Sequence, residues 1–129
     1  MLTIKEDYVS FETAKLLKEK GFNIETIKYW ENEGGTTTAP SICELSEPYS
    51  NSYLGTHEYS CPSQSMVMKW LRGAHNIDIF PWKIGKGVYS CAIFNSNTGQ
   101  DLSSDKDFPA EKYEETAEAA IKYCLINLI

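Results

Sequence analysis

The chain has 129 residues and carries 18 acidic against 12 basic side chains, which gives a formal net charge of −6. This length suits a single domain over residues 1–129. The negative charge disfavours nonspecific binding to nucleic acid or to an anionic membrane, because phosphate groups need a positive field. No stretch approaches the ~20 apolar residues that cross a bilayer, and the first residues lack the basic and apolar regions of a secretory signal. We therefore expect a cytoplasmic protein that does not contact a membrane.

Three amphipathic helices are predicted in chain order. The first follows Ser10, a good N-cap residue, and ends at Gly21, because glycine commonly closes helices. The second begins near Pro62, which suits the first helical position. Its apolar arc consists of Met66, Val67, Trp70, Leu71 and Ala74. The third starts near Pro109 and runs to the C-terminus, with glutamates in its first half, where the helix dipole favours them.

Strands are predicted at residues 24–32, 41–45, 76–84 and 88–94. The first two would be joined by the Gly-Gly-Thr-rich loop at 34–38, and the last two form a hairpin through Gly-Lys-Gly at 85–87. Within the third strand the apolar parity switches beside Pro81. A bulge or an edge position there explains the switch, since proline cannot donate to a β-ladder.

The predicted order is therefore α-β-β-α-β-β-α. Helices on a mainly antiparallel sheet make an α+β structure. We expect one layer of about four strands with three helices packed on it.

Four cysteines are present without any C-x-x-C pair, so reduced thiols are expected in the cytoplasm. A metal site could draw on Cys43, His57, Cys61 and His75, which are spaced C-x13-H-x3-C-x13-H. That spacing matches no zinc-site pattern, because such sites usually present close ligand pairs. We expect neither a metal nor another cofactor.

A thiol nucleophile is one candidate for chemistry. Cys61 precedes the second helix, where the dipole and the unpaired N–H groups would lower the pKa of a thiol. His57 lies four residues upstream and could act as a base. The alternative is that Cys61 is a small residue at the junction of a loop and a helix.

A binding loop is the second candidate. Residues 46–63 combine tyrosines with Ser, Asn and Gly, the types that give large contact area and adaptable hydrogen bonds. Lys69 and Arg72 face outward from the helix that follows, and His75 lies at its end. The predicted binding site consists of Tyr49, Tyr53, Tyr59, Lys69, Arg72 and His75. The alternative is that the tyrosines pack the loop onto the sheet.

Three blocks of the sequence carry a family resemblance: "SFETAKLLKEKGF", "YSCPSQSMVMKWLRGAHNIDI" and "KYEETAEAAIKYCLINLI". They resemble a group of small proteins encoded by prophages and mobile elements of gut bacteria, and they span about half of this chain. Cys61 stands where these relatives often carry Ala, which weakens a catalytic role for its thiol. The group has no assigned activity, so the resemblance implies a bacterial or phage cytoplasm and an accessory role without naming any functional residue.

These observations favour a small non-enzymatic binding protein of a phage or mobile element, with a protein as partner. The alternative is a small hydrolytic or thiol-dependent enzyme that uses His57, Cys61 or His75. A third possibility is specific nucleic-acid binding, which would require four cations to meet on one face: Lys69, Arg72, Lys83 and Lys86. A homodimer through the sheet is expected if Trp82 or the Tyr89 face of the last strand is exposed.

Overall fold

The computed structural model describes residues 5–32 and 39–129. The chain divides into two compact units. The N-terminal unit comprises Tyr8–Ser63, and the C-terminal unit comprises Met1–Asp7 with Gln64–Ile129. Helices and small antiparallel sheets occur in the order α1-β1-β2-β3-α2-β4-β5-α3, which confirms the predicted α+β class. The expectation of a single domain stays a prediction.

In the N-terminal unit, α1 (Phe11–Glu19) begins and ends as its sequence predicts. The Ser10 side chain accepts a hydrogen bond from the Thr13 N–H at 3.3 Å, which satisfies one of the unpaired donors of the first turn. Gly21 has a φ of +88°, a conformation that glycine adopts without a steric penalty. The buried side of the helix carries Thr13, Ala14 and Leu17.

The sheet of this unit has three antiparallel strands, β1 (Thr26–Glu31), β2 (Ser41–Tyr49) and β3 (Glu58–Ser60), with β1 in the centre. Phe11 of α1 packs edge-on against Trp30 of β1 and Tyr59 of β3, with ring centroids 6.2 and 5.6 Å apart. Trp30 and Tyr59 are registered partners across the two strands, so one aromatic side chain of the helix covers both. This contact joins α1 to the sheet.

The strand β3 is the main departure from the prediction of one four-stranded layer. Residues 46–63 were expected to form a loop, but β2 continues to Tyr49 and residues 58–60 pair with β1. The chain therefore forms a three-stranded and a two-stranded sheet. The return loop predicted at 34–38 lies outside the described residues.

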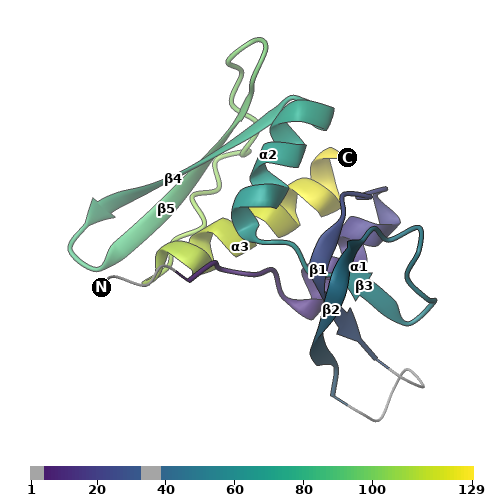
Figure 1. The fold of residues 1–129 in the computed structure, drawn as a ribbon. Helices are drawn as coiled ribbons and strands as arrows, with labels where there is room; N and C mark the ends of the chain where they lie inside the picture. Colours follow the sequence, from purple (N-terminus) through teal and green to yellow (C-terminus); the bar gives the residue numbers. More distant parts are fainter. Residues whose placement is uncertain (1–4, 33–38) are drawn as a thin grey trace. The chain divides into compact units, whose positions relative to one another are not determined.

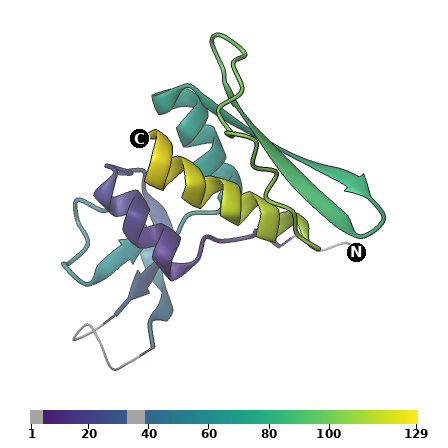
Figure 2. The ribbon, with the colours of Figure 1, turned by 180° about the vertical axis from the view of Figure 1, so that it is seen from behind.

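In the C-terminal unit, α2 (Gln64–His75) leads directly into β4 (Ile77–Gly85) through Asn76, whose φ is +55°. β4 pairs with β5 (Val88–Asn95), and α3 (Tyr113–Tyr123) follows and ends in a π-helical turn, Cys124–Leu128. Both helices lie on the same side of the hairpin, as Figures 1 and 2 show from opposite directions. The strand side chains buried beneath them are Ile77, Ile79, Cys91 and Ile93.

Two local predictions in this unit are corrected. The helix α2 begins at Gln64 and not at Pro62, and Ala74 of the predicted apolar arc is exposed. The strand β4 keeps a regular alternation through Pro81, because its bulge lies further along, between Lys83 and Gly85. Of the two explanations given for the apolar parity switch, the edge position is therefore the correct one.

Candidate binding site

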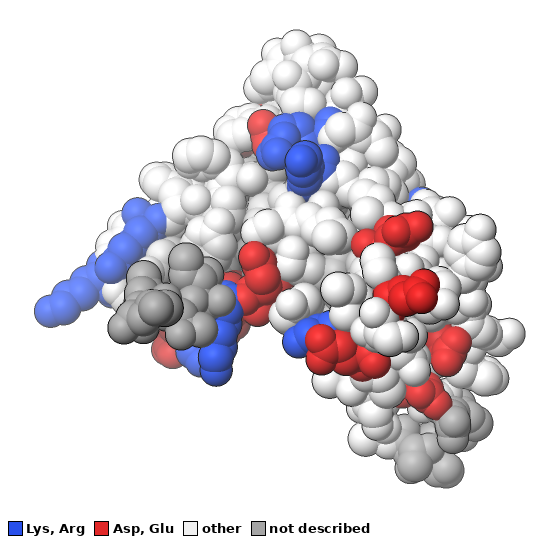
Figure 3. Space-filling model, in the orientation of Figure 1, with Lys and Arg blue, Asp and Glu red and all other residues white. Residues whose placement is uncertain are grey.

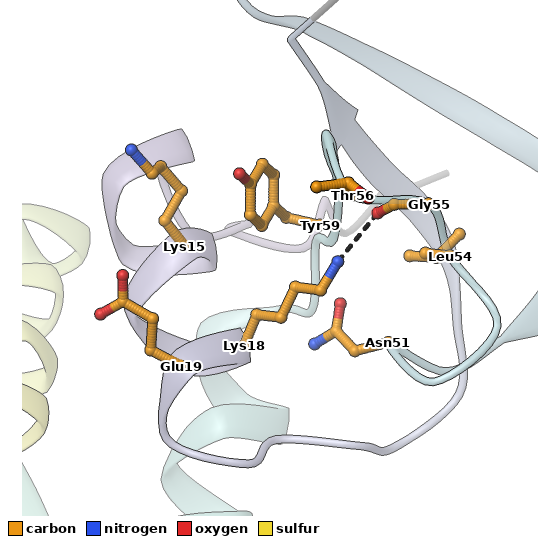
Figure 4. A pocket seen from close by; sticks show the side chains of 8 residues that line it. All are labelled: Lys15, Lys18, Glu19, Asn51, Leu54, Gly55, Thr56 and Tyr59. Carbon is orange, nitrogen blue, oxygen red and sulfur yellow. Dashed lines mark hydrogen bonds between the residues drawn. The ribbon is translucent and has the colours of Figure 1, made fainter. Parts of the chain in front are cut away.

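A groove between α1 and the loop that follows β2 is the candidate binding site of the N-terminal unit (Figure 4). It has a volume of about 490 Å³. We call it the α1 groove, and it is lined by Lys15, Lys18, Glu19, Asn51, Leu54, Gly55, Thr56 and Tyr59. The volume falls within the range of ~300–1,000 Å³ that small-molecule or side-chain pockets occupy.

Lys18 connects the two walls of the α1 groove. Its Nζ donates hydrogen bonds to the carbonyl oxygens of Gly55 at 2.9 Å and Glu58 at 2.8 Å. The same ammonium lies 5.0 Å from the centroid of the Tyr59 ring, within reach of a cation–π attraction. Partial burial lowers the pKa of Lys18, and the charge of Glu58 opposes this shift.

The loop that forms one wall of the α1 groove contains a short hydrogen-bonded turn. Glu58 accepts a hydrogen bond from the Gly55 N–H at 2.6 Å through its carboxylate, and its N–H donates to the Gly55 carbonyl at 3.1 Å. A Cβ on Gly55 would lie 3.1 Å from that carboxylate, so glycine suits the close approach. These two hydrogen bonds close the turn between Gly55 and Glu58.

Asn51 anchors the other end of this loop. Its amide nitrogen donates to the Phe22 carbonyl at 2.8 Å, and its side-chain oxygen accepts from the Ser60 N–H at 2.9 Å. Both bonds are buried, where unmade hydrogen bonds are costly. A second depression of about 360 Å³ adjoins this place and shares Lys18 and Asn51 with the α1 groove.

The predicted tyrosines have different surroundings. Tyr59 is half-buried against Phe11 and Lys18, so its role is partly the packing that was the alternative. Tyr49 and Tyr53 lie beside each other with ring centroids 6.4 Å apart, and Tyr53 is 78% exposed. Tyr59 on β3 therefore lines the groove, whereas Tyr49 at the end of β2 and Tyr53 in the loop that follows lie at the surface.

The predicted cationic residues belong to the other unit. Lys69, Arg72 and His75 all lie on α2. Arg72 forms an exposed ion pair with Asp78 at 3.4 Å, and His75 packs against Trp70 with ring centroids 4.8 Å apart. The composite site therefore divides into a tyrosine half in one unit and a cationic half in the other.

Sequence reasoning did not select Lys15, Lys18 or Thr56. Lys15 and Lys18 lie three positions apart on the polar side of an amphipathic helix, a pattern that is typical of a solvated face. Their meeting with residues 54–56 depends on β3 pairing with β1, and a three-residue strand gives almost no periodic signal.

Cys61 and His57, the two residues considered for thiol chemistry, differ in how far they are buried. Cys61 is only 1% exposed, and its thiol donates to the Val9 carbonyl at 3.6 Å, whereas His57 is exposed. None of the four cysteines, all of which are described, forms a disulfide. Among residues 5–32 and 39–129, no group of three or more His, Cys, Asp and Glu side chains could hold a metal ion.

The N-terminal unit is also acidic over its strands. Residues 8–63 contain eight Glu and four Lys, a net charge of −4. On the face drawn in Figure 3, acidic side chains gather over the strands of this unit. The strands carry Glu31, Glu44, Glu47 and Glu58.

Comparison with protein-family models, with curated proteins and with solved structures found no match. Within the part of the chain that the structure describes, no helix has the length and apolar character needed to cross a membrane.

Proposed function

We propose that the protein is a non-enzymatic binding protein that holds a protein partner on the α1 groove and on the exposed Tyr49–Tyr53 pair beside it. The observation that carries this proposal is the groove, lined by polar and apolar side chains, next to two exposed tyrosines, Tyr49 at the end of β2 and Tyr53 in the loop that follows. Tyrosine contributes large contact area at low entropic cost, and interfaces are enriched in it. An anchored loop also loses little conformational entropy on binding.

A protein partner agrees with the charge of the unit. Nucleic acid would meet a unit of net charge −4, which would oppose the phosphate backbone. Two lysines and one glutamate line the α1 groove, so a partner side chain could be matched by charge within it. The resemblance to prophage and mobile-element proteins adds an accessory role in a bacterial cytoplasm to the same proposal.

The alternative of a thiol enzyme has less support. A nucleophilic thiol must reach its substrate and must ionise, and Cys61 is buried with its thiol directed at a backbone carbonyl. His57 and His75 lie in different units, so no single unit supplies both as an acid and a base.

The test is affinity capture from the native host, followed by titration of the identified partner against variants. Tyr53→Ala removes the most exposed tyrosine, and Thr56→Arg fills the α1 groove. Each should weaken the partner's affinity at least about tenfold, as loss of an interface tyrosine or occlusion of a pocket does. Ile42→Ala, a change at an exposed residue of β2 in the same unit, should leave the affinity unchanged.

Arg72→Glu then decides whether the cationic half on α2 takes part in the same interface. A partner that binds Tyr53→Ala and Thr56→Arg as tightly as it binds the wild-type protein would overturn the proposal.

A further inference from the structure

The two faces of the β4–β5 hairpin differ sharply. On the side covered by α2 and α3, Ile79 and Ile93 are buried. On the opposite side, apolar side chains that would normally be covered are open to solvent. We call this surface the hairpin face, and it consists of Phe80 (62% exposed), Trp82 (50%), Ile84 (48%) and Val88 (37%).

The hairpin face has no charged side chain between Asp78 and the turn. The outward positions of β4 alternate from Phe80 to Trp82 and on to Ile84. Their cross-strand neighbours on β5 are small and uncharged: Ala92, and Ser90, which is buried and donates its hydroxyl to the Asp107 carbonyl at 2.6 Å. A contiguous apolar surface without charge indicates an interaction site and favours a partner surface that is itself apolar.

Both edges of the hairpin resist addition of another strand. The outer edge of β5 is occupied, because Tyr89 exchanges backbone hydrogen bonds with Ala110 and the Cys91 N–H donates to the Asp107 carbonyl at 2.9 Å. Pro81 is registered opposite Cys91. Since the Cys91 N–H points away from β4, this pair is not hydrogen-bonded, and the nitrogen of Pro81 faces the open edge of β4 without a proton. A partner strand would lose a ladder bond in the middle of that edge.

We propose that the hairpin face is a homodimer interface, in which two copies pack face to face about a two-fold axis at Trp82. An isologous interface requires a self-complementary surface. The outward side chains of β4 satisfy this requirement. When two copies pack with their β4 strands antiparallel about Trp82, each Trp82 meets the partner's Trp82 and each Phe80 lies towards the partner's Ile84. Strands of two sheets packed in this way lie nearly aligned, with their inner side chains interdigitated.

The size of the hairpin face predicts a weak, reversible dimer. At these exposed fractions its four side chains offer about 100 Å² each, or about 800 Å² from the two copies. That total lies below the ~1,200 Å² at which stable specific interfaces begin, in the range of weak, transient contacts. The hairpin face and the α1 groove belong to different units and share no residue, so this inference goes beyond the proposed function.

Sedimentation equilibrium of the full chain tests the dimer, at concentrations from about 5 to about 500 µM, which bracket weak affinities. The wild-type protein should pass from monomer to dimer within this range. Trp82→Glu and Trp82→Lys should each raise the dissociation constant at least about 30-fold, because each sets two like charges on the axis. An equimolar mixture of the two variants should dimerise again, since opposite charges then meet.

Matched variants separate association from folding. Ile42→Glu alters an exposed apolar residue of the other unit and should leave the dimer unchanged. Trp82→Thr, a good strand residue without charge, should also dissociate the dimer while it keeps the circular dichroism of the wild type. The wild-type tryptophan emission should move to shorter wavelength as concentration rises, and Trp82→Thr should lack this change.

Three outcomes overturn the inference: a wild-type protein that stays monomeric at every concentration, charged variants that dimerise as the wild type does, or a mixture of the two charged variants that stays monomeric.

Discussion

The two units use the same construction, helix packed on antiparallel strands, but they place the aromatic side chains of their strands differently. The N-terminal unit directs Trp30 and Tyr59 towards Phe11 of its helix. Its strands carry acidic side chains (Figure 3), together with the exposed aliphatic residues Ile27 and Ile42. The C-terminal unit fills the space under its helices with isoleucines and leaves Phe80 and Trp82 exposed.

Aromatic content alone therefore does not locate an exposed apolar surface. Both units have aromatic residues on their strands. Whether those residues are buried or exposed depends on which side of the sheet the unit's own helices cover. A phenylalanine on α1 packs against aromatic side chains of its sheet. The strand side chains that pack under α2 and α3 are mainly aliphatic. The surplus apolar area of the hairpin is then available for another molecule.

The largest expected effect comes from comparing two substitutions, one on the buried face of the hairpin and one on its exposed face. Ile93→Ala should lower the free energy of unfolding by about 3 kcal/mol, because Ile93 is fully buried and its removal leaves a cavity. Phe80→Thr on the exposed face should change it by about 0.5 kcal/mol or less. Urea denaturation at low protein concentration measures both, and equal losses would show that the outer face also contributes to the core.

The second prediction concerns the α1 groove. Lys18→Met keeps the aliphatic chain but removes both hydrogen bonds to the loop, and it should cost about 2 kcal/mol, since bonds from a charged donor are among the stronger ones. Hydrogen exchange of the 55–58 amides should become faster. Lys15→Met is the matched control on the same helix and should cost no more than about 0.5 kcal/mol. A similar loss in both variants would mean that Lys18 does not act as a link.

The third prediction follows from a buried thiol of the C-terminal unit. Burial raises the pKa of Cys124 from 9.0 to about 12. The folded state therefore holds the proton more tightly than the unfolded state, and this contribution to stability is full below about pH 9 and is lost as the pH rises towards 12. Cys124→Ala should make the fall of unfolding free energy above pH 9 shallower, by at most about 1.4 kcal/mol per pH unit. An unchanged slope would contradict the assignment to Cys124.

The smallest effects come from one glycine in each unit. Gly21→Ala should destabilise the protein by about 1 kcal/mol, because φ is +88° there although no atom lies within 4 Å of the added Cβ. Gly73→Ala in α2 also meets no atom within 4 Å and should stabilise the protein by about 0.5–1 kcal/mol, since alanine favours a helix. Thermal unfolding measures both, and shifts of the same sign would contradict the backbone argument.

Much of the fold follows from local signals in the sequence. Ser10 and Gly21 mark α1 because capping depends on neighbouring residues alone. Gly-Lys-Gly at 85–87 joins two strands within one residue of their predicted ends. The strand β3 was missed because it has three residues and exists only through its pairing with β1.

The exposed face of β4 shows why other parts could not be predicted. The apolar parity switch at Phe80 and Trp82 left two explanations open, a bulge at Pro81 or an edge position, and the sequence did not choose between them. The strand in fact alternates regularly, with apolar residues on both sides. Sequence periodicity identifies the sides of a strand, but it does not tell which side is covered.

Lys18 also sets an order on the folding of its unit. Its two acceptors lie 37 and 40 residues further along the chain, so the bonds can form only after a long segment has closed. Closing that segment costs conformational entropy, and the two hydrogen bonds offset this cost only after the closure is complete. We expect α1 to form early and its link to the loop to form late, so that Lys18→Met speeds unfolding and leaves the folding rate nearly unchanged. The α1 groove would then be the last part of the unit to assemble and the first to open.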